Sequence, residues 1–82
     1  MYLHIGKDVS VKLKDIIGIF NIETLQKTKE YEKITEDLKY NIIDISEGKQ
    51  KTIILTIENN IKKGYISNIL STTLEKRTKN II

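Results

Sequence analysis

The chain has 82 residues, of which 39% are hydrophobic and 30% charged, and its formal net charge at pH 7 is +3. This length allows one domain, spanning 1–82, with a thin core, and it excludes a second domain. The chain contains no cysteine, which excludes a disulfide framework and a thiolate metal site and favours a cytoplasmic location. No stretch approaches the roughly 20 apolar residues of a membrane span, so we expect no membrane partner.

Two strands joined by a tight turn are predicted for the first 20 residues. Residues 2–5 form the first strand, and the Gly-Lys-Asp sequence at 6–8 has the composition of a turn. The second strand covers 9–20, where aliphatic residues first alternate with polar ones. This period of two places the aliphatic side chains on one face of a sheet and the lysines on the other.

The second predicted strand changes character at Asp15. Before it, Lys12 and Lys14 lie on the polar face, whereas the run at 16–20 (IIGIF) is almost continuously apolar. Such a run is typical of a strand that is covered on both faces. Gly18 within it predicts a bulge or a close approach of another segment.

The middle of the chain predicts one helix followed by a β-hairpin. Apolar residues recur every three or four positions over 24–38, which indicates an amphipathic helix. Strands are expected at 41–45 and 51–58. The intervening Ser-Glu-Gly-Lys-Gln at 46–50 is the expected hairpin connection, because its glycine suits a positive φ.

A short strand and a short helix are expected at the C-terminal end. Residues 59–64 contain Asn-Asn and Lys-Lys-Gly and predict a loop, followed by a strand at 65–69. A helix follows at 73–78, with Thr72 as its N-cap and Glu75 three residues later, a capping-box pattern. Residues 79–82 are expected to be a frayed tail.

Together these elements predict an α+β domain: a small antiparallel sheet of about five strands with a central helix and a short C-terminal helix. The core is expected to consist of aliphatic side chains from the second and fourth strands, some of which would also contact another subunit. These residues are Val11, Leu13, Ile16, Ile17, Ile19, Ile53, Leu55 and Ile57.

The sequence offers little for catalysis. His4 is the sole histidine and lies in a predicted strand, where a structural role is far commoner than a catalytic one. No cysteine nucleophile exists, and no serine has a convincing His–Asp pairing. The glycines are dispersed, which excludes a phosphate-binding loop. We therefore expect no enzyme, no cofactor, no metal site and no small-molecule substrate.

Lysines gather at predicted turns and strand ends, whereas most acidic residues lie between Glu23 and Glu47. Lysine-bearing loops can bind DNA phosphates, which provides affinity with little base readout. The candidates for phosphate contact are Lys14, Lys49 and Lys51, followed by Lys12 and Arg77. The alternative is that these lysines keep the surface soluble and protect sheet edges.

Several segments carry a resemblance to a known family. MYLHIG at 1–6 is followed by DIIGIF at 15–20, GKQK at 48–51 leads into TIILTIEN, and TLEKR at 73–77 lies near the end. In order and spacing these segments resemble the RemB branch of the RemA/RemB extracellular-matrix regulatory family, across essentially the whole chain.

This resemblance implies a cytosolic bacterial regulator that favours transcription of biofilm-matrix genes. For the RemA branch it also implies a fold akin to LytTR-type DNA-binding domains, with subunits in rings whose basic loops bind DNA. The RemA branch has an arginine just before its second-strand apolar run, where this chain has Lys14-Asp15. It also has an Arg-Arg pair in the hairpin loop, where this chain has Lys49-Gln50-Lys51. Lysine keeps the positive charge but lacks the guanidinium fork.

Two hypotheses follow. In the first, the protein is a transcriptional regulator that binds DNA through its lysine-bearing loops as a homo-oligomer, which the resemblance implies to be a ring. Several weak sites on one assembly raise the avidity without new contacts. In the second, it is an interaction module of the same regulatory system that assembles with itself or with a partner and does not bind DNA.

Overall fold

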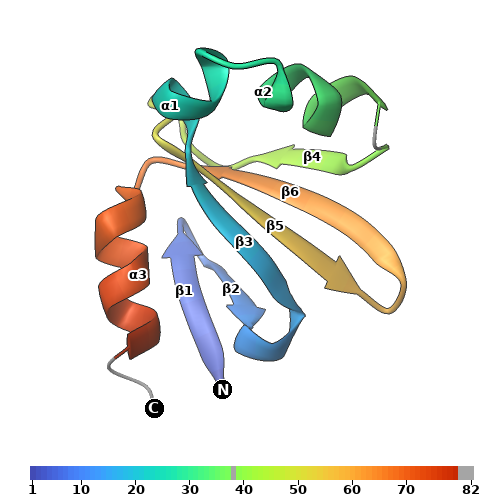
Figure 1. Ribbon diagram of the computed structural model, residues 1–82. Coiled ribbons are helices and arrows are strands. Elements are labelled where there is room, and N and C mark those ends of the chain that lie inside the picture. Colours follow the sequence, from blue (N-terminus) through green and yellow to red (C-terminus); the bar gives the residue numbers. More distant parts are fainter. Residues whose placement is uncertain (38, 80–82) are drawn as a thin grey trace.

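A computed structural model describes residues 1–37 and 39–79 of the chain (Figure 1). Two strands form one small sheet, and four strands form a second in the order β3-β5-β6-β4. The elements are β1 (Tyr2–Gly6), β2 (Val9–Lys12), the 3₁₀ turn η1 (Leu13–Asp15), β3 (Ile16–Asn21), α1 (Ile22–Gln26), α2 (Glu30–Glu32), the π-helical turn η2 (Lys33–Asp37), β4 (Asn41–Asp44), β5 (Thr52–Glu58), β6 (Ile61–Ser67) and α3 (Ser71–Lys79).

The α+β class is confirmed, but the expected single antiparallel sheet is wrong. Residues 9–20 do not form one strand, because η1 breaks them at Leu13–Asp15. β2 pairs with β1, whereas β3 pairs with β5 in the other sheet. The change of character at Asp15 therefore marks the point where the chain passes from one sheet to the other.

The expected hairpin at 46–50 is also wrong. β4 runs parallel to β6, which lies between β4 and β5. β6 begins at Ile61, so Lys62 and Lys63 lie in a strand and not in a loop. The hairpin is formed by β5 and β6 around Asn59 and Asn60, whose φ values of 51° and 68° suit a two-residue turn.

The predicted central helix starts earlier and is interrupted. Asn21 caps α1 by accepting a hydrogen bond from the Thr24 amide at 3.0 Å. The Thr28 hydroxyl donates to the Leu25 carbonyl at 2.8 Å and accepts from the Glu30 amide at 3.2 Å. The Thr28 hydroxyl thus hydrogen-bonds to the C-terminal end of α1 and to the N-terminal end of α2, and Thr28 separates the two helices. The expected end of this helix at Leu38 lies outside the described residues.

Both faces of β5 are buried, and each face contributes to a separate hydrophobic cluster. Ile54 packs in the cluster formed with the β1–β2 pair and α3; its other buried members are Leu3, Ile5, Val11, Ile45, Tyr65 and Leu74. Ile53 and Leu55 pack on the opposite side; the other buried members there are Ile22, Ile34 and Ile66. The four-stranded sheet is therefore a middle layer, with α1, α2 and η2 covering one face (Figure 1).

The predicted core is correct in part. Val11, Ile53 and Leu55 are buried, but Ile17 is 52% exposed and Ile57 is 40% exposed. The apolar run of β3 is not covered on both faces within this chain, because Phe20 is also 39% exposed, and β3 is in addition an edge strand of its sheet. The bulge predicted at Gly18 is confirmed, since the β3–β5 register shifts between Ile16 and Gly18.

The C-terminal helix is longer than predicted. α3 begins at Ser71, so Thr72 lies inside the helix and is not its N-cap. Lys79 belongs to α3 and not to a tail, and the rest of the predicted tail, 80–82, lies outside the described residues. In residues 1–37 and 39–79 no helix has the length and apolar character needed to cross a bilayer.

The burial of β5 predicts unequal effects of one substitution at two sites on this strand. Ile54 is fully buried and Ile57 is 40% exposed. Ile54→Val should lower the free energy of unfolding by about 0.5–1.5 kcal/mol. The matched control Ile57→Val should change it by less than about 0.5 kcal/mol. Urea unfolding followed by circular dichroism measures both, and equal effects would contradict the burial of Ile54.

Candidate nucleic-acid interface

The five basic residues predicted to contact phosphates are all exposed and come from three parts of the fold. Lys12 ends β2 and Lys14 lies in η1. Lys49 and Lys51 lie in the connector between β4 and β5. Arg77 lies in the last turn of α3.

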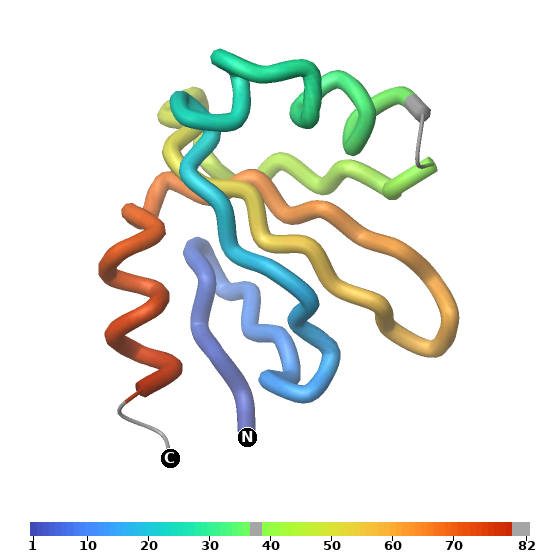
Figure 2. Tube along the Cα trace, viewed as in Figure 1, coloured from blue at the N-terminus to red at the C-terminus, as the bar shows by residue number. Residues whose placement is uncertain are grey.

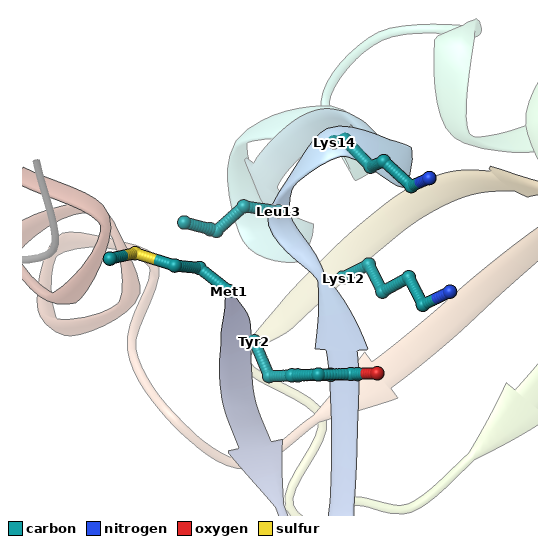
Figure 3. A pocket seen from close by; sticks show the side chains of 5 residues that line it. All are labelled: Met1, Tyr2, Lys12, Leu13 and Lys14. Atoms are coloured by element: carbon teal, nitrogen blue, oxygen red, sulfur yellow. The ribbon is translucent and has the colours of Figure 1, made fainter.

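The first lysine group, Lys12 and Lys14, is positioned by the turn η1. The Leu13 amide donates to the Met1 carbonyl at 3.0 Å, which ties η1 to the start of β1. In the β1–β2 register Lys12 is the direct partner of Tyr2. Figure 3 shows that the side chains of Tyr2, Lys12 and Lys14 extend to one side, whereas Met1 and Leu13 extend to the other.

Two adjoining surface hollows share Tyr2, Lys12 and Lys14. The larger has a volume of about 480 Å³ and is completed by Met1 and Leu13. The second has a volume of about 250 Å³; its remaining lining consists of Ser10, Val11, Asp15, Glu58 and Asn59. Acidic groups therefore line the second hollow, and only basic or uncharged side chains line the first.

Glu58 is held by a polar cluster that the sequence pattern does not predict. Its Oε2 accepts hydrogen bonds from the Thr56 hydroxyl at 2.7 Å and from the Tyr65 hydroxyl at 2.9 Å. Its Oε1 lies 3.7 Å from Nζ of Lys63. Thr56 and Glu58 are two residues apart on β5, so they share a face. The sequence predicts a loop at Lys63 and therefore does not place this residue opposite them.

The environment of Glu58 shifts two ionisation equilibria. Burial acts to raise the pKa of Glu58, but the hydrogen bonds from Thr56 and Tyr65 and the charge of Lys63 outweigh it, so this pKa lies below its ordinary value. Burial, followed by the bond to Glu58, raises the pKa of Tyr65 to about 12. Glu58 is therefore ionised and compensated near the first lysine group.

The second lysine group, Lys49 and Lys51, lies on a connector whose backbone is fixed. The Asp44 carboxylate accepts from the Ser46 hydroxyl at 2.6 Å and from the Gln50 amide at 2.9 Å. The Ser46 hydroxyl bond, the Ser46 backbone bond and the Gln50 bond, in that order, hold the pKa of Asp44 below its ordinary value. The Lys49 amide donates to the Ser46 carbonyl at 3.1 Å.

Lys51 joins this connector to two other elements. Its amide donates to the Ser67 carbonyl at 3.0 Å, and its carbonyl accepts from the Ile22 amide at 3.0 Å. Figure 2 shows the yellow connector passing beside the cyan start of α1 and the orange end of β6. The side chains of Lys49 and Lys51 stay exposed while their backbone is held in place.

The structure does not bring the five basic residues into one patch. Lys51 immediately precedes β5, whereas η1 lies at the other end of that strand, where Ile16 pairs with Thr56. The five residue steps from Lys51 to Thr56 span roughly 17 Å. Arg77 is separate again, because its Nη1 donates to the His4 carbonyl at 2.9 Å and joins α3 to β1.

Metal-ligating side chains do not gather in the part of the chain that the structure describes: no three His, Cys, Asp or Glu residues there could hold an ion together. His4, the sole histidine, bonds through Nε2 to the Lys7 carbonyl at 2.8 Å.

Comparison with known proteins assigns a family. The profile of a family described as RemA-like, "Extracellular matrix regulatory protein A-like", matches residues 2–78. Extracellular matrix regulatory protein B of Bacillus subtilis (strain 168) is 32% identical over 79 residues, which cover 96% of this chain and 91% of that protein.

The lowered pKa of Glu58 predicts an acid-sensitive contribution to stability. A carboxylate whose folded-state pKa is depressed stabilises the fold above its unfolded-state pKa, and this contribution is lost as the pH falls through the folded-state value. Glu58→Gln removes the titrating group. Its free energy of unfolding should therefore decline less than that of the wild type from about pH 6 to about pH 3.

Urea titrations at each pH measure this decline. Glu47→Gln is the matched control, because Glu47 is an exposed acid that forms no ion pair among the described residues. It should decline in parallel with the wild type. A Glu58→Gln profile parallel to the wild type would contradict the contribution of this cluster.

Proposed function

The chain belongs to the RemA-like family of extracellular matrix regulatory proteins, and on this basis we propose that it is a transcriptional regulator that binds DNA as a homo-oligomer. The observation that carries the proposal is the presence of two separate groups of exposed lysines, Lys12 with Lys14 and Lys49 with Lys51, each held on a fixed backbone. The biofilm-matrix genes, the LytTR-like fold and the cytoplasmic location are predictions from the family resemblance.

The chemistry of these groups suits phosphates better than base edges. Lysine ammonium groups neutralise phosphate charge and release counterions, which provides affinity without sequence information. The commonest specific contact is made by arginine to guanine, and Arg77 is the sole arginine of the sequence. It already donates to the His4 carbonyl. We therefore propose backbone binding with little base readout.

Assembly would compensate for the small number of contacts that one chain offers. The two lysine groups lie at opposite ends of β5, so one chain presents two small basic patches and not a continuous basic surface. An oligomer repeats both groups on every subunit. Several weak sites that engage one duplex raise the avidity by orders of magnitude.

The free edge of β3 supports self-assembly. β3 lies at the end of the four-stranded sheet, and its Ile17 and Phe20 are 52% and 39% exposed. An exposed apolar edge strand is a template for pairing with another chain unless something covers it. We propose that this edge forms part of the contact between subunits, which would cover the apolar run at 16–20.

A second candidate function is an interaction module that does not bind DNA. Asp15 follows Lys14 directly, and Asp15 and Glu58 both line the hollow beside Lys12 and Lys14. These carboxylates oppose the approach of a phosphate to the first lysine group. Assembly through β3 needs none of the lysines, so it would persist without DNA binding.

DNA binding predicts a steep dependence of affinity on salt. The logarithm of the association constant should fall linearly with the logarithm of the salt concentration, with a slope of about −0.9 per phosphate neutralised. The double variant Lys49→Gln, Lys51→Gln should flatten this slope by about 1–2 and weaken binding at every salt concentration. Fluorescence anisotropy with a labelled duplex measures both effects.

The control for charge alone is Lys27→Gln with Lys29→Gln. These exposed lysines have the same spacing but lie between α1 and α2, outside both groups. This double variant should retain the slope of the wild type. No duplex binding at low salt by an intact oligomer would contradict the proposal and favour the interaction module.

The β3 interface predicts a loss of assembly on charge insertion. Ile17→Lys should shift the protein to a smaller species in multi-angle light scattering, because an ammonium group would be buried in the contact. Ile61→Lys is the matched control, because Ile61 is 47% exposed but begins the interior strand β6. It should leave the mass unchanged. A wild-type protein that is monomeric at micromolar concentration would contradict assembly altogether.

A further inference from the structure

We propose that the hollow lined by Tyr2, Lys12 and Lys14 binds a nucleoside phosphate, with the base stacked on the Tyr2 ring and the phosphate held by the two ammonium groups. The nucleotide is either free or at an unpaired end of a strand, since both present the same base and phosphate. This site shares Lys12 and Lys14 with the proposed duplex interface but adds a contact to a base, because paired bases are stacked on one another and offer no free face to a tyrosine.

Tyr2 and Lys12, which line the hollow, lie on the outward face of the β1–β2 pair. Leu3 and Val11 point into the core, so the alternation along each strand turns their neighbours outward. Tyr2 and Lys12 are direct partners across the two strands, and Tyr2 is 62% exposed. Its ring is thus presented to solvent beside an ammonium group (Figure 3).

The Tyr2 ring is free to bind a planar group. Its hydroxyl has no hydrogen-bond partner among residues 1–37 and 39–79, and the ring is not part of either hydrophobic cluster. This contrasts with Tyr65, which is buried and donates to Glu58. Exposed tyrosine rings stack on bases of any sequence, because every base has a π-face.

The two lysines are available to a phosphate on one side of this ring. Neither Lys12 nor Lys14 forms an ion pair within the described residues. The larger hollow contains no carboxylate, while Asp15 and Glu58 line only the smaller one. Glu58 is in turn compensated by Lys63. Asp15 and Glu58 lie beside the same lysines, so of the two hollows the larger is the more favourable place for the phosphate.

The size and support of the hollow fit a small ligand. Its volume of about 480 Å³ falls within the range of about 300–1,000 Å³ that is usual for ligand sites. Met1 and Leu13 complete its lining, although their side chains extend away from the Tyr2 ring (Figure 3), and the bond from the Leu13 amide to the Met1 carbonyl holds the two segments together. Inorganic phosphate alone would leave the tyrosine unused, and an apolar ligand would leave the lysines unused.

Amide chemical-shift titration of the full chain tests this site. AMP is the probe, compared with adenosine and with inorganic phosphate. AMP should change the amide chemical shifts of β1, Lys12 and η1 in a saturable way. Adenosine and inorganic phosphate should each bind at least about tenfold more weakly than AMP. A 5′-phosphorylated single-stranded oligodeoxyadenylate, run in parallel, distinguishes a strand end from a free nucleotide.

Substitutions test separately what the Tyr2 ring and the two lysine charges contribute to AMP binding. Tyr2→Leu should weaken AMP binding by about tenfold or more, whereas Tyr2→Phe, which retains the ring, should bind as the wild type does. Lys12→Gln with Lys14→Gln should weaken AMP but not adenosine. Lys7→Gln, at the turn on the opposite end of the β1–β2 pair, is the matched control and should change nothing.

Three results would overturn the site: no saturable shifts with AMP or with the oligonucleotide, AMP binding no tighter than phosphate, or AMP binding that Tyr2→Leu leaves unchanged. Duplex binding by the same preparation is measured separately. Binding of neither AMP nor the oligonucleotide, together with intact duplex binding, overturns this site alone, whereas binding of either probe without duplex binding overturns the proposed function alone.

Discussion

The burial of β5 on both faces is the constraint on which the rest of the structure depends. Ile54 on one face and Ile53 with Leu55 on the other supply the centres of two hydrophobic clusters. Burying each such side chain contributes about 1.5–3 kcal/mol. A domain of 82 residues buries a smaller fraction of its surface on folding than a larger domain does, so both layers packed on the sheet are needed to complete these clusters.

Several surface features follow from this arrangement. The chain must leave the β1–β2 pair and enter the larger sheet, and η1 makes that change of direction. Lys14 lies in the turn and Lys12 just before it, so their exposed side chains lie at one end of β5. The connector before β5 carries Lys49 and Lys51 at the other end, so the two lysine groups are separated by the length of the strand that organises the core.

Partial compensation of charge distinguishes the two lysine groups. Asp15 and Glu58 lie beside the first group, and Glu58 is held ionised by hydrogen bonds and by Lys63. Beside the second group, Asp44 bonds to Ser46 and Gln50 and so stabilises the connector. The groups are therefore chemically unequal: a mixed-charge hollow with an aromatic ring at one end of β5, and a rigid basic loop at the other.

The sequence by itself determined the α+β class, most strand and helix positions, the bulge at Gly18 and the family. These depend on local patterns: the alternation along β5, the apolar stripe over α1 and η2, and the spacing of short motifs. Local propensity could also identify which residues are basic and exposed, because lysines at strand ends are solvated whatever the topology.

Only the tertiary structure decided which strands pair and which lysines lie together. The β4–β6 pair is parallel and joins segments separated by the whole of β5, and no local turn signal records that contact. The alternating pattern predicts one strand, which the 3₁₀ turn at Leu13–Asp15 divides in two. A local pattern does not predict this turn, because the two parts of the predicted strand pack in two separate layers. The cluster around Glu58 and the placement of Tyr2 beside Lys12 likewise depend on strand register, which pairs residues far apart in sequence.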